Sequence, residues 1–85
     1  MHHDLKSAEP HFTNVCLGIK PMEVRRDDRD FRIGDTVTYH RVKDGEMTGD
    51  TVGPFTIGLV IRHRDFPEGI QPGFCVYSHF INAKQ

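Results

Sequence analysis

The segment from Pro54 to Arg62 limits the possible folds of this chain more than any other part of the sequence. Along it, large apolar residues alternate with smaller or polar ones, a period of two that is typical of a β-strand with one buried face. The expected buried face carries Phe55, Ile57, Leu59 and Ile61, and the expected outer face carries Thr56, Gly58, Val60 and Arg62. A strand of this kind must join a sheet, so other strands are expected to pair with it.

Four other segments have strand character. Thr36–Val42 and Gly73–Ile81 are rich in β-branched and aromatic residues, and His3–Lys6 is a short opening strand. In Lys20–Arg26, apolar and charged residues alternate, so Met22 and Val24 are expected to face the interior. Polar residues at 27–30, and stretches with several glycines or prolines at 43–53 and 63–73, are expected to be turns and loops.

One early helix is expected between Ser7 and Leu17. Phe12, Val15, Cys16 and Ile19 recur at the spacing of one helical face. Ser7 is a suitable N-terminal cap, Gly18 is suited to end the helix, and Pro21 cannot continue it. The sequence therefore predicts an α+β fold, mainly β, in which about five strands form a small, partly open β-barrel with one early helix.

Length and charge restrict the function further. A chain of 85 residues is one domain, residues 1–85, with a small core. Its net charge is only −1, which argues against a general binder of long polyanions and leaves room for a local basic pocket. No apolar run is long enough for a transmembrane helix, and the first residues do not resemble a signal peptide, so we expect a cytoplasmic protein whose two cysteines, Cys16 and Cys75, are reduced and buried.

The segment that carries most of the candidate chemistry begins at Lys20. Glu23 and Arg25 share one face of the expected strand, and Lys20 lies just before it, next to the end of the helix. A carboxylate accepts a hydrogen bond from the exocyclic amine of a base, while Arg donates to a carbonyl, to N7 or to a phosphate. These three side chains are therefore candidates for a binding site. The alternative is that they form ordinary solvated ion pairs without a binding role.

An ordered set of short motifs extends over nearly the whole sequence. The set consists of His3-Asp4-Leu5-Lys6, Phe12 in the expected helix, G-x-K-x-x-E-x-R at Gly18–Arg25, Asp28-Arg29-Asp30-Phe31, Gly34-Asp35, Phe66-Pro67 and Gly73-Phe74-Cys75-Val76-Tyr77. In this order the motifs resemble the DUF3850 family, a branch of the PUA-like ASCH group found in bacteria and their phages.

The resemblance implies a PUA-like barrel, a cleft between helix and barrel, and binding of RNA or of a nucleotide or nucleoside. It places the site first at Lys20, Glu23 and Arg25. His3, Lys6, Asp28 and Arg29 are further ligand-binding candidates. The expected function is a binding module without catalysis and without a cofactor.

Two alternatives remain open. Some ASCH proteins are amidohydrolases that act on acylated cytidine, and Lys20 and Glu23 would be the catalytic residues of such an enzyme here. Against this, Pro21 replaces a small polar residue, Glu23 stands where those enzymes have Thr, and Phe74–Ile81 has no carboxylate. The second alternative is a protein-interaction module, such as a phage-encoded inhibitor.

Other signals are weaker. The six histidines have no spacing typical of metal ligands, so no metal site is expected, and Met1-His2-His3 would chelate Cu(II) or Ni(II) only incidentally. Phe66 is the best candidate to stack on a base, with His63 and Arg64 near it to contact phosphate. Phe74 is expected in the core.

Overall fold

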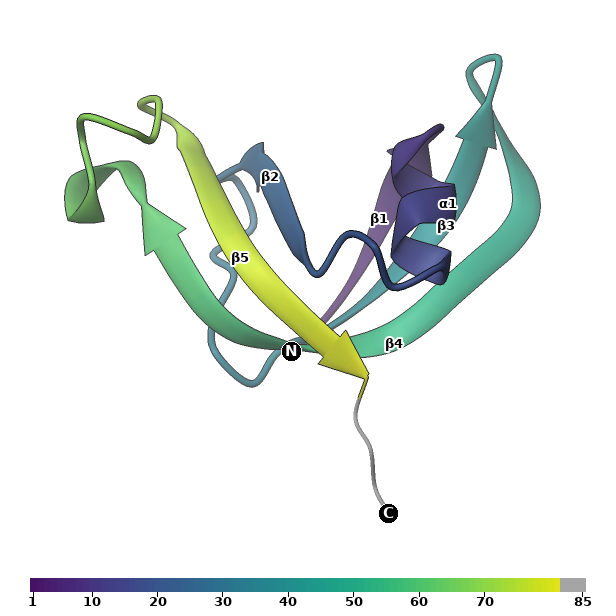
Figure 1. Cartoon of the computed structure of the whole chain (residues 1–85), viewed down its shortest axis with the longest axis horizontal. Helices are drawn as coiled ribbons and strands as arrows, with labels where there is room; N and C mark the ends of the chain where they lie inside the picture. The colour runs from purple at the N-terminus through teal and green to yellow at the C-terminus, as the bar shows by residue number, and fades with distance from the viewer. Residues whose placement is uncertain (82–85) are drawn as a thin grey trace.

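Five strands and one short α-helix make up the fold in the computed structural model, which describes residues 1–81 (Figure 1). The elements are β1 (His2–Ala8), α1 (His11–Cys16), β2 (Met22–Arg26), β3 (Thr36–Lys43), β4 (Glu46–Arg62), a 3₁₀ turn η1 (His63–Asp65) and β5 (Phe74–Ile81). The prediction of a mainly β fold with one early helix is thus confirmed.

All five strands belong to one sheet, in the order β1-β3-β4-β5-β2. β1 runs parallel to β3, and the other neighbours are antiparallel. The long β4 curves along the bottom of the view in Figure 1, and it extends from the side of the molecule where α1 lies to the side where β5 begins. The sheet does not close, so β1 and β2 remain as its two edge strands.

The core lies inside this curved sheet. Val37, Tyr39, Ile57, Cys75 and Tyr77 come from the inner faces of β3, β4 and β5, and each is fully buried. From α1, Phe12 and Val15 pack against the same cluster. Burying one large apolar side chain contributes about 1.5–3 kcal/mol, so this small set supplies much of the stability of the fold.

The helix is shorter than predicted. β1 continues to Ala8 because its ladder with β3 extends to the pair Ala8–Val42, so Ser7 lies in a strand and caps no helix. Glu9 takes over part of that role, because its carboxylate accepts hydrogen bonds from the backbone N–H and the hydroxyl of Thr13. Gly18 ends the helix as expected, with a positive φ of 74°.

The end of α1 and the residues that follow it depart from the expected helical face. Ile19 follows the end of the helix and is exposed, and Cys16 is exposed as well, contrary to the prediction that both cysteines are buried. Cys75 is buried as expected, and burial raises the pKa of its thiol to about 11.

The prediction of a loop at residues 43–53 is wrong. Asp44 and Gly45, with φ of 53° and 82°, form a tight turn between β3 and β4, and β4 already begins at Glu46. Two successive residues with positive φ are typical of the hairpin turn whose twist matches the strands it joins.

The second half of β4 also departs from strict alternation. A register shift between Ile57 and Val60 turns Leu59 outward, where it is 53% exposed.

The inner face of β2 is opposite to the predicted one. Val24 is 62% exposed and Met22 is also exposed, whereas Glu23 is only 4% exposed. The carboxylate faces the interior because that part of the interior is a polar pocket and not the apolar core.

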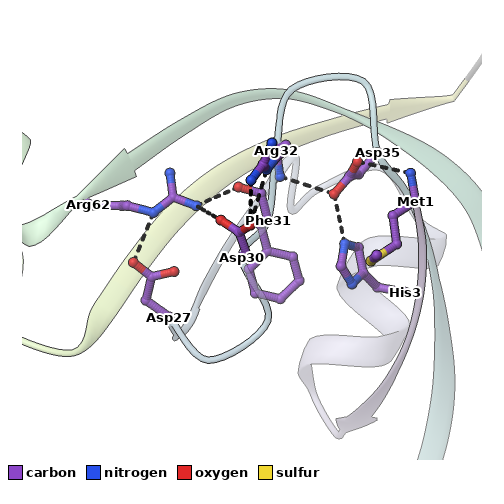
Figure 2. Close-up of polar contacts among 8 residues, drawn as sticks. All are labelled: Met1, His3, Asp27, Asp30, Phe31, Arg32, Asp35 and Arg62. Atoms are coloured by element: carbon purple, nitrogen blue, oxygen red, sulfur yellow. Dashed lines mark hydrogen bonds and ion pairs between the residues drawn. The ribbon is translucent and has the colours of Figure 1, made fainter.

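A polar cluster fixes the connection between β2 and β3 (Figure 2). Asp35 accepts hydrogen bonds from the ring Nε2 of His3 at 2.8 Å, from the amine of Met1 at 3.1 Å and from the backbone N–H of Arg32 at 3.1 Å. Burial opposes ionisation of Asp35, but these hydrogen bonds outweigh it and hold the pKa of the carboxyl below its usual range. The His3 ring of this cluster packs against the fully buried ring of Phe31, with 4.8 Å between the ring centres.

On the other side of Phe31, Arg62 joins β4 to the same connection. Its guanidinium donates to the carboxylate of Asp27 at 2.9 Å and to the backbone carbonyl of Phe31 (Figure 2).

None of the helices in residues 1–81 is long and apolar enough to cross a membrane.

Candidate functional site

The two edge strands of the sheet face each other across an open seam, which two arginines bridge. Arg25 donates from Nη2 to the backbone carbonyl of Lys6, and Arg29 donates from Nη1 to the carbonyl of Asp4 at 3.2 Å. We call these two guanidinium groups the arginine bar. Their side chains bond to backbone carbonyls of β1 that would pair with the backbone of a further strand if the sheet continued.

The edge of β2 also directs backbone groups into the seam. Just beyond the two ends of β2, the backbone hydrogen bonds from His79 N–H to Pro21 O and from Asp27 N–H to Gly73 O mark directly paired residues. Because paired and unpaired residues alternate in an antiparallel ladder, Glu23 and Arg25 bond to β5, and the backbone groups of Val24 between them point away from it, toward the seam. The seam thus has backbone donors and acceptors on both sides.

A pocket of about 570 Å³ lies in the seam, and we call it the seam pocket. Five cationic side chains and two carboxylates line it, although the whole chain carries a net charge of −1. The lining residues are Leu5, Lys6, Ser7, Ala8, His11, Lys20, Glu23, Val24, Arg25, Arg26, Asp28, Arg29, Phe31 and Phe74. The local excess of positive charge makes the pocket suited to an anionic ligand.

Glu23 is the buried acid of this pocket. Arg25 donates from Nε to Glu23 Oε2 at 2.9 Å, and Nζ of Lys20 lies 2.9 Å from Oε1 as an ion pair whose direction does not make a hydrogen bond. A carboxylate has about four lone-pair sites, so Glu23 retains acceptor capacity toward a ligand.

Ser7 is 4% exposed, and its buried hydroxyl has no hydrogen-bond partner within residues 1–81. It lies on the inner face of β1 and lines the seam pocket. Buried hydroxyls normally find a partner, because an unsatisfied one costs about 1–3 kcal/mol. A ligand with a polar group at this depth would supply that partner.

The backbone of Lys20 is fixed from two directions. Its N–H donates to the carbonyl of Asn14 at 3.1 Å, in the turn that Gly18 makes after the helix. Its carbonyl accepts from Nε2 of His79 at 2.9 Å. The Lys20 side chain therefore extends into the pocket from a rigid point on the fold.

The contact with Lys20 also fixes the tautomer of His79. A carbonyl can only accept, so Nε2 carries the hydrogen, and burial lowers the pKa of His79 and keeps the ring neutral. Nδ1 must then accept the hydrogen bond from Tyr39, whose oxygen in turn accepts from Tyr77 at 2.9 Å. Burial also raises the pKa of Tyr77 to about 12 and that of Tyr39 still further.

His11 completes the surroundings of Lys20. Its Nδ1 lies 3.2 Å from Nζ of Lys20, and because an ammonium group only donates, Nδ1 accepts this hydrogen bond. Lys20 thus lies between the carboxylate of Glu23 and the ring of His11, and its position depends on both.

The structure brings together most of the residues predicted for the site. Six of the seven predicted residues line the seam pocket: Lys6, Lys20, Glu23, Arg25, Asp28 and Arg29. His3 is not among them, because its ring packs against Phe31 at 4.8 Å and binds Asp35. Thus His3 supports the loop that carries the pocket and does not line it.

Eight of the fourteen lining residues were not predicted for the site, and four of these eight, Ser7, His11, Arg26 and Phe74, bear on the chemistry of the pocket. Ser7 was assigned to a helix cap and Phe74 to the core, while His11 and Arg26 belonged to no motif. Phe74 is only half-buried and lies under the guanidinium of Arg26, 5.4 Å from its ring centre. The alternation of inner and outer residues along β1 and β5 was the sequence signal that could have revealed the positions of Ser7 and Phe74.

The predicted stacking residue lies elsewhere. Phe66 borders a separate apolar hollow formed with Leu59, Ile61 and Ile70, and His63 donates from Nδ1 to the carbonyl of Ile70 at 2.6 Å. Within residues 1–81, no three His, Cys, Asp or Glu side chains are grouped to hold a metal ion. The chemistry of the seam pocket is therefore that of its cations, Glu23 and Ser7.

Comparison with known protein families gives one match of high coverage. Residues 2–79 match the family described as a domain of unknown function (DUF3850). No curated protein matches the sequence. The matched range includes every residue that lines the seam pocket.

Proposed function

The chain belongs to the DUF3850 family, and we propose that it is a binding module that takes one nucleotide, free or within a single-stranded RNA, into the seam pocket. The observation that carries the proposal is the combination of a cationic lining with an acceptor, Glu23, and an unpartnered hydroxyl, Ser7, at the buried side. This combination suits a ligand that has both negative charge and a polar edge.

The two parts of a nucleotide match different parts of the pocket. Glu23 would accept a hydrogen bond from a base amine or ring N–H, and Ser7 can donate or accept beside it. The more exposed cations, Lys6, Arg26 and Arg29, would hold the phosphate. A volume of about 570 Å³ lies within the range of small-ligand sites.

The proposal includes a PUA-like (ASCH) assignment of the fold and a cytoplasmic location. A curved five-stranded sheet with an early helix, and a basic motif at the helix-to-strand junction, support the first. An exposed Cys16 and a buried Cys75, which form no disulfide, support the second.

Binding to a panel of ribonucleoside monophosphates and short single-stranded RNAs, measured by calorimetry at low salt, tests the proposal. We expect saturable binding that weakens as salt increases, because phosphate contacts release counterions. Lys20→Ala should weaken binding about tenfold or more, since it removes a charged donor worth about 1.5–3 kcal/mol. Lys43→Ala, an equal loss of charge on the hairpin, should not. A folded protein that binds no member of the panel would overturn the proposal.

An amidohydrolase is the second candidate, because Lys20 and Glu23 lie 2.9 Å apart in the same pocket. Such a pair can transfer a proton during attack on an amide. The expected result for this candidate is release of a carboxylic acid from N-acylated cytidines, followed by mass spectrometry, with loss of turnover in Glu23→Gln. An unchanged substrate after long incubation removes it and leaves the binding proposal intact.

A further inference from the structure

A second hollow of about 610 Å³ lies against the arginine bar, and we call it the outer hollow. Its lining comprises Asp4, Leu5, Lys6, Arg25, Arg29, His40 and Met47. Four of these residues also line the seam pocket: Leu5, Lys6, Arg25 and Arg29. The two hollows therefore meet along the bar.

The outer hollow differs in chemistry from the seam pocket. Met47, 59% exposed at the start of β4, and the half-buried ring of His40 offer a polarisable apolar surface. The one carboxylate of this hollow, Asp4, is engaged by Nε2 of His40 at 2.9 Å. Such a lining favours contact with the flat face of a base more than recognition of its edge.

The bar between the hollows keeps donors for an anion. Arg25 uses Nε and Nη2, and Arg29 uses Nη1, for contacts inside the protein. Within the described part of the chain, Nη1 of Arg25 and both Nε and Nη2 of Arg29 have no acceptor. Guanidinium groups held in place in this way suit the two non-bridging oxygens of a phosphodiester.

Resting on the proposed function, we infer that the site recognises a dinucleotide step of a single-stranded nucleic acid. One nucleotide occupies the seam pocket, the phosphodiester lies on the arginine bar, and the neighbouring nucleotide lies in the outer hollow against Met47 and His40. Each hollow has a volume within the small-ligand range, so neither needs to expand.

The test compares a nucleoside 5′-monophosphate with the dinucleoside monophosphate of the same base, in ribose and deoxyribose series, by calorimetry. We expect the dinucleotide to bind about tenfold more tightly or better, since one stacked base contributes a factor of that order. A gain in either series supports the inference, and the series with the larger gain identifies the preferred sugar.

Met47→Ala separates the outer hollow from the seam pocket. Met47 is exposed, so we expect the variant to fold, to lose most of the dinucleotide gain and to bind the mononucleotide within about twofold of the parent. Met22→Ala, at an exposed methionine that lines neither hollow, should keep the gain.

The outcomes distinguish the inference from the proposed function. Equal affinity for the two ligands, or an equal loss for both in Met47→Ala, overturns the dinucleotide inference and leaves nucleotide binding intact. Absence of binding to either ligand overturns both.

Discussion

The hydroxyl of Tyr39 donates to Nδ1 of His79 across 2.7 Å in the core of the sheet. On its other side, the His79 ring donates to the carbonyl of Lys20, one of the five cations of the seam pocket. A neutral imidazole is the form that can make both contacts, because it accepts at one nitrogen and donates at the other. The position of Lys20 therefore depends on the protonation state of a buried core residue.

This relationship predicts loss of stability on mild acidification. Burial lowers the pKa of His79 in the folded protein, while the unfolded chain has the ordinary value of about 6.5. As pH falls below that value, the unfolded state binds a proton that the folded state does not. The free energy of unfolding should then decrease by up to about 1.4 kcal/mol per pH unit until the folded pKa is reached. Urea denaturation at several pH values and constant ionic strength measures this decrease.

His79→Gln is the control for the acid effect. Glutamine keeps an N–H donor for the Lys20 carbonyl but does not titrate, so the variant should be less stable near neutral pH and show a flatter pH dependence between about pH 5 and 6.5. An unchanged slope in this variant would assign the effect to other groups. The lowered pKa values of Asp4, Glu9 and Asp35 act only at more acidic pH, below their unfolded values.

Ser7→Ala should separate stability from binding. The Ser7 hydroxyl is buried without a partner, so its removal should leave the free energy of unfolding unchanged or raise it by up to about 1 kcal/mol. The same change should weaken nucleotide binding several-fold if the ligand supplies the missing partner. Thermal unfolding and calorimetric titration of one preparation give both quantities.

Ser78→Ala is the matched control for Ser7→Ala. Its hydroxyl accepts from the N–H of Leu59 at 3.0 Å and lines neither hollow. This variant should lose about 1 kcal/mol of stability and keep its affinity. Loss of stability in Ser7→Ala with unchanged binding would show that Ser7 has only a structural role.

The two cysteines should differ in reactivity. Cys16 is exposed, whereas Cys75 is fully buried and its pKa is raised to about 11 by burial. Ellman's reagent at mildly alkaline pH should modify one thiol quickly and the second only on unfolding. Cys16→Ser should abolish the fast phase. Two fast thiols in the native protein would contradict the described burial of Cys75.

Gly53 should tolerate substitution less well than Gly49. A Cβ at Gly53 would lie 2.8 Å from the carbonyl oxygen of Val37, and its φ is 125°; at Gly49, φ is 95° and no atom lies within 4 Å of such a Cβ. Gly53→Ala should therefore cost about 1–3 kcal/mol for strain plus the backbone clash, and Gly49→Ala should cost the strain alone. Equal losses in urea denaturation would show that the clash relaxes.

Strand periodicity predicted the fold best where one face meets an apolar core. The strands β3 and β5 bury Tyr39, Cys75 and Tyr77 in strict alternation and were expected nearly to the residue. The hairpin at Asp44–Gly45 had a readable turn signal, which the glycines and charges that follow it obscured. The register shift in β4 depends on the partner strand, so the sequence of β4 alone could not reveal it.

The candidate site was predicted in its residues but not in its geometry. The order of the motifs predicted that Lys20, Glu23 and Arg25 form one site. The alternation of apolar and charged residues, however, predicted that Met22 and Val24 face the interior. That rule assumes an apolar interior, and the inner face of β2 instead meets a polar pocket. Ser7 remained hidden because serine at the start of an apolar pattern is also typical of a helix cap.

The open seam also affects how the molecule behaves in a crowded solution. An unpaired edge strand is a template for strands of other molecules and a common origin of fibrous aggregates. Here the two edges face each other, and a foreign strand would have to displace the arginine bar and enter a pocket lined by five cations. The sheet therefore remains unclosed without offering either edge for polymerisation.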